Sequence, residues 1–188
     1  AGISNRPDAV ILSYPVISSG EYAHQGSFKA LLGPEATAEE LAYMSLEHHV
    51  THRTPPVFLW HTATDEAVPV ENSLLFAKAC KENGVPFELH VFGNGMHGLS
   101  LANRQWASGE YGRDYTMEQV YETVQYMIDH GMELPPPYDQ IGPVPKGADA
   151  RQTVNQFFSR FSRLRQPVEG IAAWPELAHQ WLRKIFAL

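Results

Sequence analysis

The 188-residue sequence predicts an α/β fold in which helices flank a parallel sheet. Two apolar runs typical of buried strands, residues 56–60 and 87–92, are separated by a helical segment over residues 71–83. A strand–helix–strand unit of this length produces two parallel strands joined by a right-handed crossover. A third run, residues 9–14, ends at Pro15 and fits a strand buried on both faces of the same sheet.

Capping signals and apolar spacing predict the remaining elements. Residues 19–34 are rich in glycine and polar side chains and indicate a long loop with a short helix around 28–32. Thr37 and Glu40 form a Thr-x-x-Glu capping box, which predicts a helix over residues 38–44. Further along the chain, apolar residues at helical spacing predict more helices, and a proline-rich segment predicts an extended connector: helices at 116–130, 150–165 and 174–186, and the connector at 132–149.

The composition is that of an ordinary globular domain. Hydrophobic residues make up 44% and charged residues 19% of the sequence, and the length allows one domain with a substantial core. The net charge of −7 argues against a nucleic-acid partner, which requires a basic surface. No apolar run approaches the length of a membrane span, and the single cysteine, Cys80, is expected in the core and excludes an internal disulfide. None of these features assigns a localisation.

Two polar residues follow the strands of the crossover unit at their carboxyl ends. Asp65 lies after the first strand, and His97 lies between Gly95 and Gly98 after the second. If these two strands are neighbours, their carboxyl ends lie about 5 Å apart, at the edge where open α/β sheets place their active sites. An aspartate that orients a histidine is two-thirds of a hydrolytic triad, so we expect Asp65 and His97 within hydrogen-bond reach. The simpler alternative is that both are turn residues.

Other candidate residues have structural explanations beside functional ones. Tyr14, Val16 and Ile17 follow the first strand at the carboxyl edge, where they either bind substrate in a pocket or belong to the core. A group of histidines invites a metal site, but adjacent residues point to different sides of a helix and no cysteine or well-spaced carboxylate completes a tetrahedral set. We therefore expect no metal site in this group: His48, His49, His52 and His61.

Several separate segments, in the right order, resemble one known family. The chain is similar to acetyl-xylan-esterase-like α/β-hydrolases over residues 1 to about 102 and again over about 172–186. The similarity lies in the following segments: Arg6–Ser18, His24–Phe28, Leu31–Gly33, Ser45–Glu47, Thr54–Pro56, the Asp65 segment, Val68–Ser73, Gly84–Glu88 and Met96–Leu99. Any one of these segments alone would be a weak signal, and their succession is what makes the resemblance specific.

The resemblance implies a carboxylic ester hydrolase, a serine esterase with the triad order Ser, Asp, His. In it Asp65 matches the triad acid and His97 the base, with no metal or organic cofactor. The 188 residues contain no Gly-x-Ser-x-Gly elbow, so the serine and the oxyanion hole are expected on upstream sequence. The expected substrate is a small ester, including acetyl esters of carbohydrates.

The same resemblance predicts how the chain is divided. Residues 1–102 and 171–188 correspond to the carboxyl-terminal half of an α/β-hydrolase fold. Residues 103–170 have no counterpart in the family's usual short connection, so we expect a helical insertion that acts as a cap or an interface element. The expected partner is an upstream fragment of the same hydrolase or another copy of the chain. An aromatic stripe on the insertion predicts packing within this chain or on another: Phe157, Phe158 and Phe161.

Two alternatives to the esterase remain open at this level. A prolyl-oligopeptidase-like serine peptidase also has an aspartate followed by Val-Pro, as Asp65 is followed here by Val68 and Pro69. The other alternative is an incomplete hydrolase module that folds or assembles without chemistry. A glycine-rich upstream loop would favour the esterase over the peptidase.

The missing elbow leads to a prediction about activity. We expect the 188-residue chain alone to hydrolyse p-nitrophenyl acetate no faster than free imidazole does. A positioned base supplies only part of the rate enhancement, and the nucleophile and oxyanion donors supply much of the rest. The measurement is the rate of p-nitrophenol release, with imidazole as the reference. Rapid turnover together with fluorophosphonate labelling of a serine in this chain would contradict the prediction.

Overall fold

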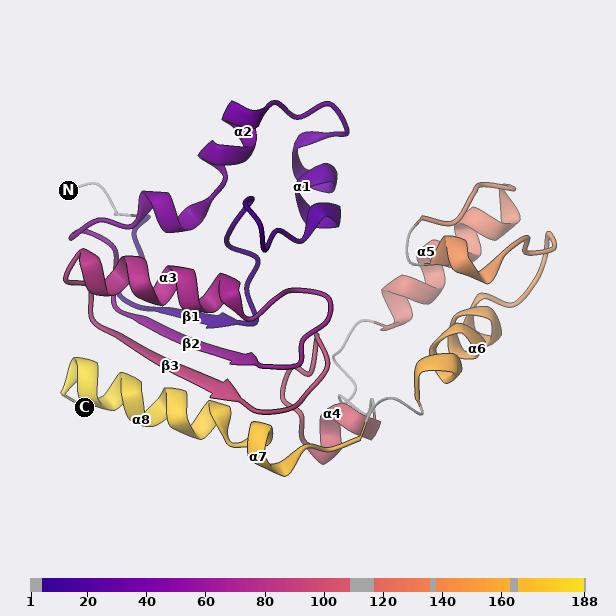
Figure 1. Cartoon of the computed structure of the whole chain (residues 1–188). Helices are drawn as coiled ribbons and strands as arrows, with labels where there is room; N and C mark the ends of the chain where they lie inside the picture. Colours follow the sequence, from indigo (N-terminus) through magenta and orange to yellow (C-terminus); the bar gives the residue numbers. More distant parts are fainter. Residues whose placement is uncertain (1–4, 109–116, 136–137, 163–165, 188) are drawn as a thin grey trace. The chain divides into compact units, whose positions relative to one another are not determined.

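The computed structural model describes residues 5–108, 117–135, 138–162 and 166–187, and for residues 160–162 it describes the backbone alone. It contains a three-stranded parallel sheet, which confirms the predicted α/β class. The strand order is β1-β2-β3 (Figure 1), and the bounds are Val10–Ser13, Val57–Thr62 and Phe87–Phe92. The register pairs Leu12 with Leu59 and Leu59 with Leu89.

Helices α3 (Glu71–Glu82) and α8 (Trp174–Phe186) lie on opposite sides of the sheet (Figure 1). The side chains of β2 alternate between these two sides and are all buried. One side joins the α3 core, which contains Val57, Leu59, Phe76 and Cys80. On the other side, Phe58 packs against Trp181 of α8, with ring centroids 5.8 Å apart. Burial raises the pKa of the Cys80 thiol to about 11, and its predicted core position is confirmed.

The predicted burial of β1 and β3 is wrong. Ile11 of β1 is 40% exposed, and on β3 the exposures of Phe87 and Val91 are 36% and 43%. The reason is the strand order, because within the described residues only β2 has a strand on each side. An apolar run identifies a strand that is compatible with full burial, but the number of its neighbours decides whether burial occurs.

The segment between β1 and β2 contains short helices. Helix α1 (Gln25–Leu32) begins earlier than predicted because His24 acts as its N-cap, accepting a hydrogen bond from the Ser27 backbone N–H. Helix α2 (Ala38–Tyr43) has the predicted Thr37–Glu40 capping box. A 3₁₀ turn, η1 (Leu46–His49), leads to β2.

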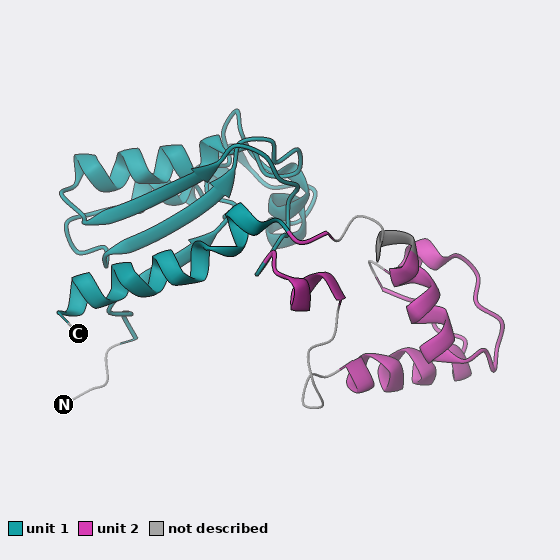
Figure 2. Ribbon diagram, turned by 90° about the horizontal axis from the view of Figure 1, so that it is seen from below, with its two compact units in different colours: residues 1–101, 168–188 teal, residues 102–167 magenta. Residues whose placement is uncertain are grey.

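The chain divides into two compact units (Figure 2), unit 1 with residues 1–101 and 168–188 and unit 2 with residues 102–167. Unit 1 contains the sheet and ends with α7 (Glu169–Ala172) and α8. Within the described residues, no helix of either unit is both long and apolar enough to cross a membrane.

Unit 2 consists of helices with an apolar core of their own. Its elements are α4 (Arg104–Ser108), α5 (Met117–Asp129), η2 (Tyr138–Ile141) and α6 (Ala150–Ser162). Val124 and Ile128 of α5 pack with Ala150 and Val154 of α6. The predicted extended connector includes the 3₁₀ turn η2, whose Tyr138 ring lies 5.7 Å from that of Phe157. Phe157 is therefore a packing residue of unit 2, whereas the predicted start of α5 at residue 116 and the Phe161 side chain lie outside the description.

The free edge of β1 leads to a prediction about association. The Val10 N–H donates to the carbonyl of the residue just before β2, and the Tyr14 N–H donates to the Trp60 carbonyl of β2. By alternation, the N–H groups of Ile11 and Ser13 point away from β2. An edge of this kind can pair with another chain. We expect light scattering to give a mass above the 21.1 kDa of one chain, because the chain is bound either to a second copy of itself or to an upstream fragment of the same hydrolase. Ile11→Lys should shift the chain toward monomer, since charge beside an edge opposes pairing.

Leu74→Lys is the matched control, because Leu74 is a 46% exposed apolar residue on α3 rather than on the edge strand. This substitution should leave the mass distribution of the parent chain unchanged. A parent chain that scatters as a clean monomer at all concentrations would rule out self-association through β1.

Candidate active site

The Asp65 carboxylate lies in the loop that follows β2, with a side chain that has no exposed surface. Its Oδ1 accepts hydrogen bonds from the backbone N–H groups of Ala67, at 3.0 Å, and Val68, at 2.9 Å. A side chain that accepts bonds from the N–H groups two and three residues later forms an Asx-type turn. This turn uses one carboxylate oxygen to fold the loop and leaves Oδ2 for another partner.

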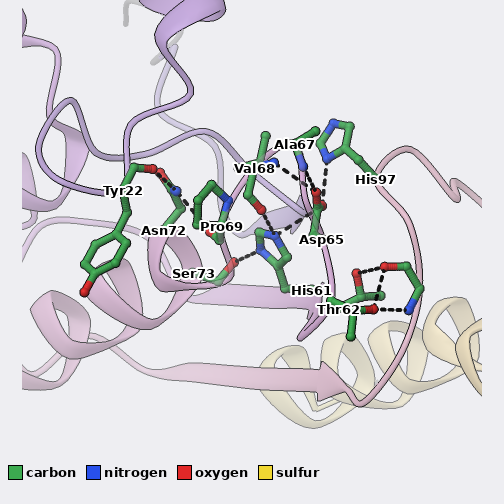
Figure 3. A network of polar contacts seen from close by, with 12 residues as sticks. Tyr22, His61, Thr62, Asp65, Ala67, Val68, Pro69, Asn72, Ser73 and His97 are labelled. Carbon is green, nitrogen blue, oxygen red and sulfur yellow. Dashed lines mark hydrogen bonds and ion pairs between the residues drawn. The ribbon is translucent and has the colours of Figure 1, made fainter.

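That partner is His97, in the loop after β3 (Figure 3), whose Nδ1 lies 2.8 Å from Asp65 Oδ2. Nδ1 donates, since an ionised carboxylate can only accept. The predicted contact at the carboxyl edge of adjacent strands is therefore confirmed. The histidine side chain is 36% exposed, so its other nitrogen, Nε2, is available to a reacting group. In neutral His97 this Nε2 carries a lone pair and can accept a proton.

Two threonines at the end of β2 hold the loop that carries His97. Thr62 Oγ1 donates to the Gly95 carbonyl at 2.9 Å, and the Gly95 N–H donates to Thr64 Oγ1 at 2.8 Å. The approach is so close that a Cβ at Gly95 would lie 2.8 Å from both Thr62 Cγ2 and Leu99 Cδ1. Glycine allows this close approach, because a Cβ at this position would require either the ends of the Thr62 and Leu99 side chains or the loop itself to shift.

A second histidine, His61 of β2, lies next to the Asp65 carboxylate and is completely buried. Its Nε2 lies 2.9 Å from the Val68 carbonyl and its Nδ1 lies 2.8 Å from Ser73 Oγ (Figure 3). The carbonyl can only accept, so Nε2 carries the proton and Nδ1 accepts from the serine hydroxyl. The same Nε2 lies 3.5 Å from Asp65 Oδ2. Burial lowers the pKa of His61 below the ordinary 6.5, and the neutral ring links the Asp65 loop to α3.

Asn72, also completely buried, joins the loop after β1 to the start of α3. Its Oδ1 accepts from the Ile17 and Ser18 N–H groups, each at 2.9 Å, and its Nδ2 donates to the Tyr22 and Pro69 carbonyls. No role for Asn72, Ser73 or Thr62 was predicted from the sequence. The only signal was their position at the strand and helix ends beside Asp65.

The three predicted substrate-binding residues lie in different environments. Tyr14 lies beside the imidazole of His97, with ring centroids 4.8 Å apart. Val16 is half-buried in the following loop. Ile17 is 1% exposed and belongs to the α3 core, which makes it a packing residue. Substrate contact by Tyr14 or Val16 stays a prediction.

An open depression of about 460 Å³ borders His97 and is lined by the two loops at the sheet edge. Its walls combine polar and apolar groups: Thr64, Glu66, Ala67, Asn94, Gly95 and Met96. Among the described residues, no group of three or more histidine, cysteine, aspartate or glutamate side chains is arranged to hold a metal ion. The contact between Asp65 and His97 is an arrangement that can supply a base oriented by a carboxylate.

Parallel strands flanked by helices, with an aspartate–histidine pair at their carboxyl edge, define the chain as part of an α/β-hydrolase. Residues 2–119 match the family model described as "Prolyl oligopeptidase family". The chain therefore belongs to this family. The resemblance to acetyl-xylan-esterase-like hydrolases is also confirmed, as the individual relatives show.

One relative is the Endo-1,4-beta-xylanase B of Butyrivibrio fibrisolvens, which is 55% identical over 120 residues. This match covers 64% of the chain and 19% of the relative. A solved structure, the acetyl ester-xyloside bifunctional hydrolase from Caldicellulosiruptor lactoaceticus, is 49% identical with a TM-score of 0.52, over 64% of this chain and 44% of that one. A carboxylesterase from Lactobacillus plantarum shares the fold, with 24% identity and a TM-score of 0.52. This match covers 96% of this chain and 46% of the carboxylesterase. The chain thus spans less than half the length of each of these proteins.

The buried His61 leads to a prediction about stability and pH. Its folded pKa is below its unfolded pKa, so as pH falls below about 6.5 the unfolded chain binds a proton that the folded chain does not. Stability contributed by neutral His61 is therefore present above that pH and lost below it, with a limiting slope of about 1.4 kcal/mol per pH unit. Urea unfolding between pH 7.5 and 5.5 should show a shallower pH dependence for His61→Gln than for the parent.

His52→Gln is the matched control, because His52 is an exposed histidine in the turn before β2. This substitution removes one imidazole from the chain without altering the Asp65 loop. The unfolding free energy of His52→Gln should therefore depend on pH as steeply as that of the parent. If the unfolding free energy of His61→Gln depends on pH as steeply as that of the parent, the buried imidazole of His61 does not cause the pH dependence of stability.

Proposed function

We propose that this chain contributes the acid and base of a serine esterase that hydrolyses small carboxylic esters, with acetylated carbohydrates as the substrate class. The observation that carries the proposal is the 2.8 Å contact between His97 Nδ1 and the buried Asp65 carboxylate. This contact holds the imidazole in the tautomer that leaves Nε2 unprotonated, which is what a general base requires. The proposed nucleophile is a serine of an elbow that these 188 residues do not contain.

The chemistry follows from the two side chains. His97 Nε2 would take the proton of the serine hydroxyl as the serine oxygen attacks the ester carbonyl, and then give that proton to the leaving alcohol. A bond forms between the serine and the acyl group, and the ester bond breaks. In the second half-reaction His97 takes a proton from water as the water oxygen attacks the acyl carbon. The bond between the acyl group and the serine breaks, His97 returns the proton to the serine oxygen, and the acid is released. Asp65 stays ionised and stabilises the cationic imidazole at each step.

The named relatives support the substrate class. The Caldicellulosiruptor lactoaceticus protein, 49% identical, is described as acting on an acetyl ester and a xyloside, and the Butyrivibrio fibrisolvens protein is described as a xylanase. A peptidase is the second candidate, favoured by the description of the matching family as prolyl oligopeptidase. Both activities use the same acid and base, so the Asp65–His97 contact supports them equally. A module without catalytic activity is the third reading.

The test is a chimaera in which residues 1–188 replace the matching part of the Caldicellulosiruptor lactoaceticus hydrolase. We expect the chimaera to hydrolyse p-nitrophenyl acetate and to be labelled by a fluorophosphonate at the serine of the host protein. Asp65→Asn should lower kcat on the order of 10⁴-fold, because loss of the carboxylate leaves the wrong tautomer in place. His97→Ala should lower kcat at least as far.

His90→Gln is the matched control, because His90 lies on β3, the strand that leads into the His97 loop, and makes a contact of the same 2.8 Å length with the Glu88 carboxylate. It should keep kcat within about twofold, since His90 is not at the carboxyl edge. A folded chimaera in which Asp65→Asn and His97→Ala keep the parent rate would overturn the proposal. Faster cleavage of a prolyl peptide than of the ester would favour the peptidase, and a folded but unlabelled chimaera would favour the module without activity.

A further inference from the structure

Tyr14 has an unusual backbone for a large side chain. Its φ is +38°, in the left-handed region, which is unfavourable for residues other than glycine. Its N–H nevertheless donates to the Trp60 carbonyl at 2.8 Å, so the strained residue directly continues the β1–β2 pairing. A glycine would adopt this conformation without strain. The reason for a tyrosine must therefore be sought in what its side chain contacts.

The Tyr14 ring contacts both Trp60, in the core of the sheet, and His97, at the carboxyl edge. Its centroid is 4.8 Å from that of Trp60, at an interplanar angle of 90°, and 4.8 Å from that of His97, at 70°. Edge-to-face contacts of this kind are favourable and directional. Because Trp60 is fully buried, the tyrosine ring has a rigid support on one side and limits the rotation of the imidazole on the other.

The Tyr14 hydroxyl reaches past His97 to the backbone of Ser100. The Ser100 N–H donates to the Tyr14 hydroxyl at 3.1 Å, and the Ser100 carbonyl accepts from Trp174 Nε1 at 2.8 Å. Ser100 is also left-handed, with φ +49°. Trp174 is stacked on Trp60, with centroids 5.4 Å apart and an angle of 22°. Both backbone groups of Ser100 are thus held by aromatic side chains that rest on the same buried tryptophan.

We propose that Tyr14 and Trp174 are positioning residues for His97, which hold the loop of residues 97–100 against the sheet so that the imidazole keeps its contact with Asp65. The inference rests on the proposed function, in which His97 is the base. It explains why a strained tyrosine is used at the end of β1. It also explains how the His97 loop is anchored inside unit 1, at the point where the chain leaves that unit after Leu101.

Each anchor can be removed by a conservative substitution. Tyr14→Phe deletes the hydroxyl and keeps the ring, and Trp174→Phe deletes the indole N–H and keeps an aromatic ring. The control is Tyr43→Phe, because Tyr43 is 71% exposed and also meets a histidine edge-to-face, His49 at 5.2 Å and 74°. Tyr14→Phe and Tyr43→Phe each remove one hydroxyl, whereas Trp174→Phe removes the indole N–H together with part of the ring that stacks on Trp60.

The primary measurement is the rate at which the His97 Nδ1 proton exchanges with solvent in the 188-residue chain, observed by NMR and assigned by its loss in His97→Gln. This proton is the one shared with Asp65, so its exchange reports opening of the contact. We expect exchange to become faster by on the order of two- to tenfold in Tyr14→Phe and in Trp174→Phe, the effect of one lost hydrogen bond each. Tyr43→Phe should exchange at the parent rate.

The second measurement is made in the chimaera, where positioning predicts that kcat falls several-fold while KM is unchanged. Unchanged proton exchange in both anchor variants would overturn the inference. So would a rise in KM alone, because it would make Tyr14 a substrate-contacting residue. Faster exchange in the anchor variants of the 188-residue chain, together with a chimaera that shows no esterase activity, would support the anchors and count against the proposed function. Failure of the inference and failure of the proposed function therefore give different results.

Discussion

The buried carboxylate of Asp65 is the feature on which the local structure depends. A charged group removed from water is unfavourable by several kcal/mol unless it is paired and hydrogen-bonded. Asp65 meets this requirement with the Ala67 and Val68 N–H groups on one oxygen and His97 on the other. The carboxylate can be buried only if the loop after β2 and the loop after β3 meet. Asp65 therefore makes the same geometry necessary for the fold and useful for chemistry.

The central strand β2 provides the rigid frame for this arrangement. Every one of its residues from Val57 to Thr62 is buried, with side chains alternating between α3 and α8. Trp60 supports Tyr14 and Trp174, His61 supports the Asp65 loop, and Thr62 holds the His97 loop. Consecutive residues of one strand thus fix three different parts of the site. A substitution in β2 is consequently expected to disturb the site even where it does not touch His97.

Two histidine–carboxylate contacts on neighbouring elements show why distance alone does not define a catalytic pair. His90 lies 2.8 Å from Glu88, as close as His97 lies to Asp65. The Glu88 side chain is 35% exposed, whereas that of Asp65 has no exposed surface and is held by backbone donors. A partly solvated carboxylate holds an imidazole weakly. The difference in burial and support is the reason for proposing Asp65 and His97, rather than Glu88 and His90, as the acid and base.

Local signals predicted those parts of the fold that depend on neighbouring residues in the chain. The capping box at Thr37 and the strand–helix–strand spacing both act over a few residues or one crossover, and both appear in the structure as predicted. The exposure of β1 and β3 was not predictable, because it depends on how many strands lie beside each one. The start of α1 was missed since a histidine, His24, is an uncommon N-cap.

By itself the sequence determined that Asp65 and His97 emerge at the same edge of a parallel sheet, because the crossover spacing makes their two strands parallel and the family resemblance makes those strands neighbours. Only the tertiary structure decided how they are held. The tautomer of His61, the two anchors on Ser100 and the close approach at Gly95 join residues far apart in the chain. Such contacts leave no periodic pattern, since each depends on the packing of a side chain whose neighbours are chosen by the fold.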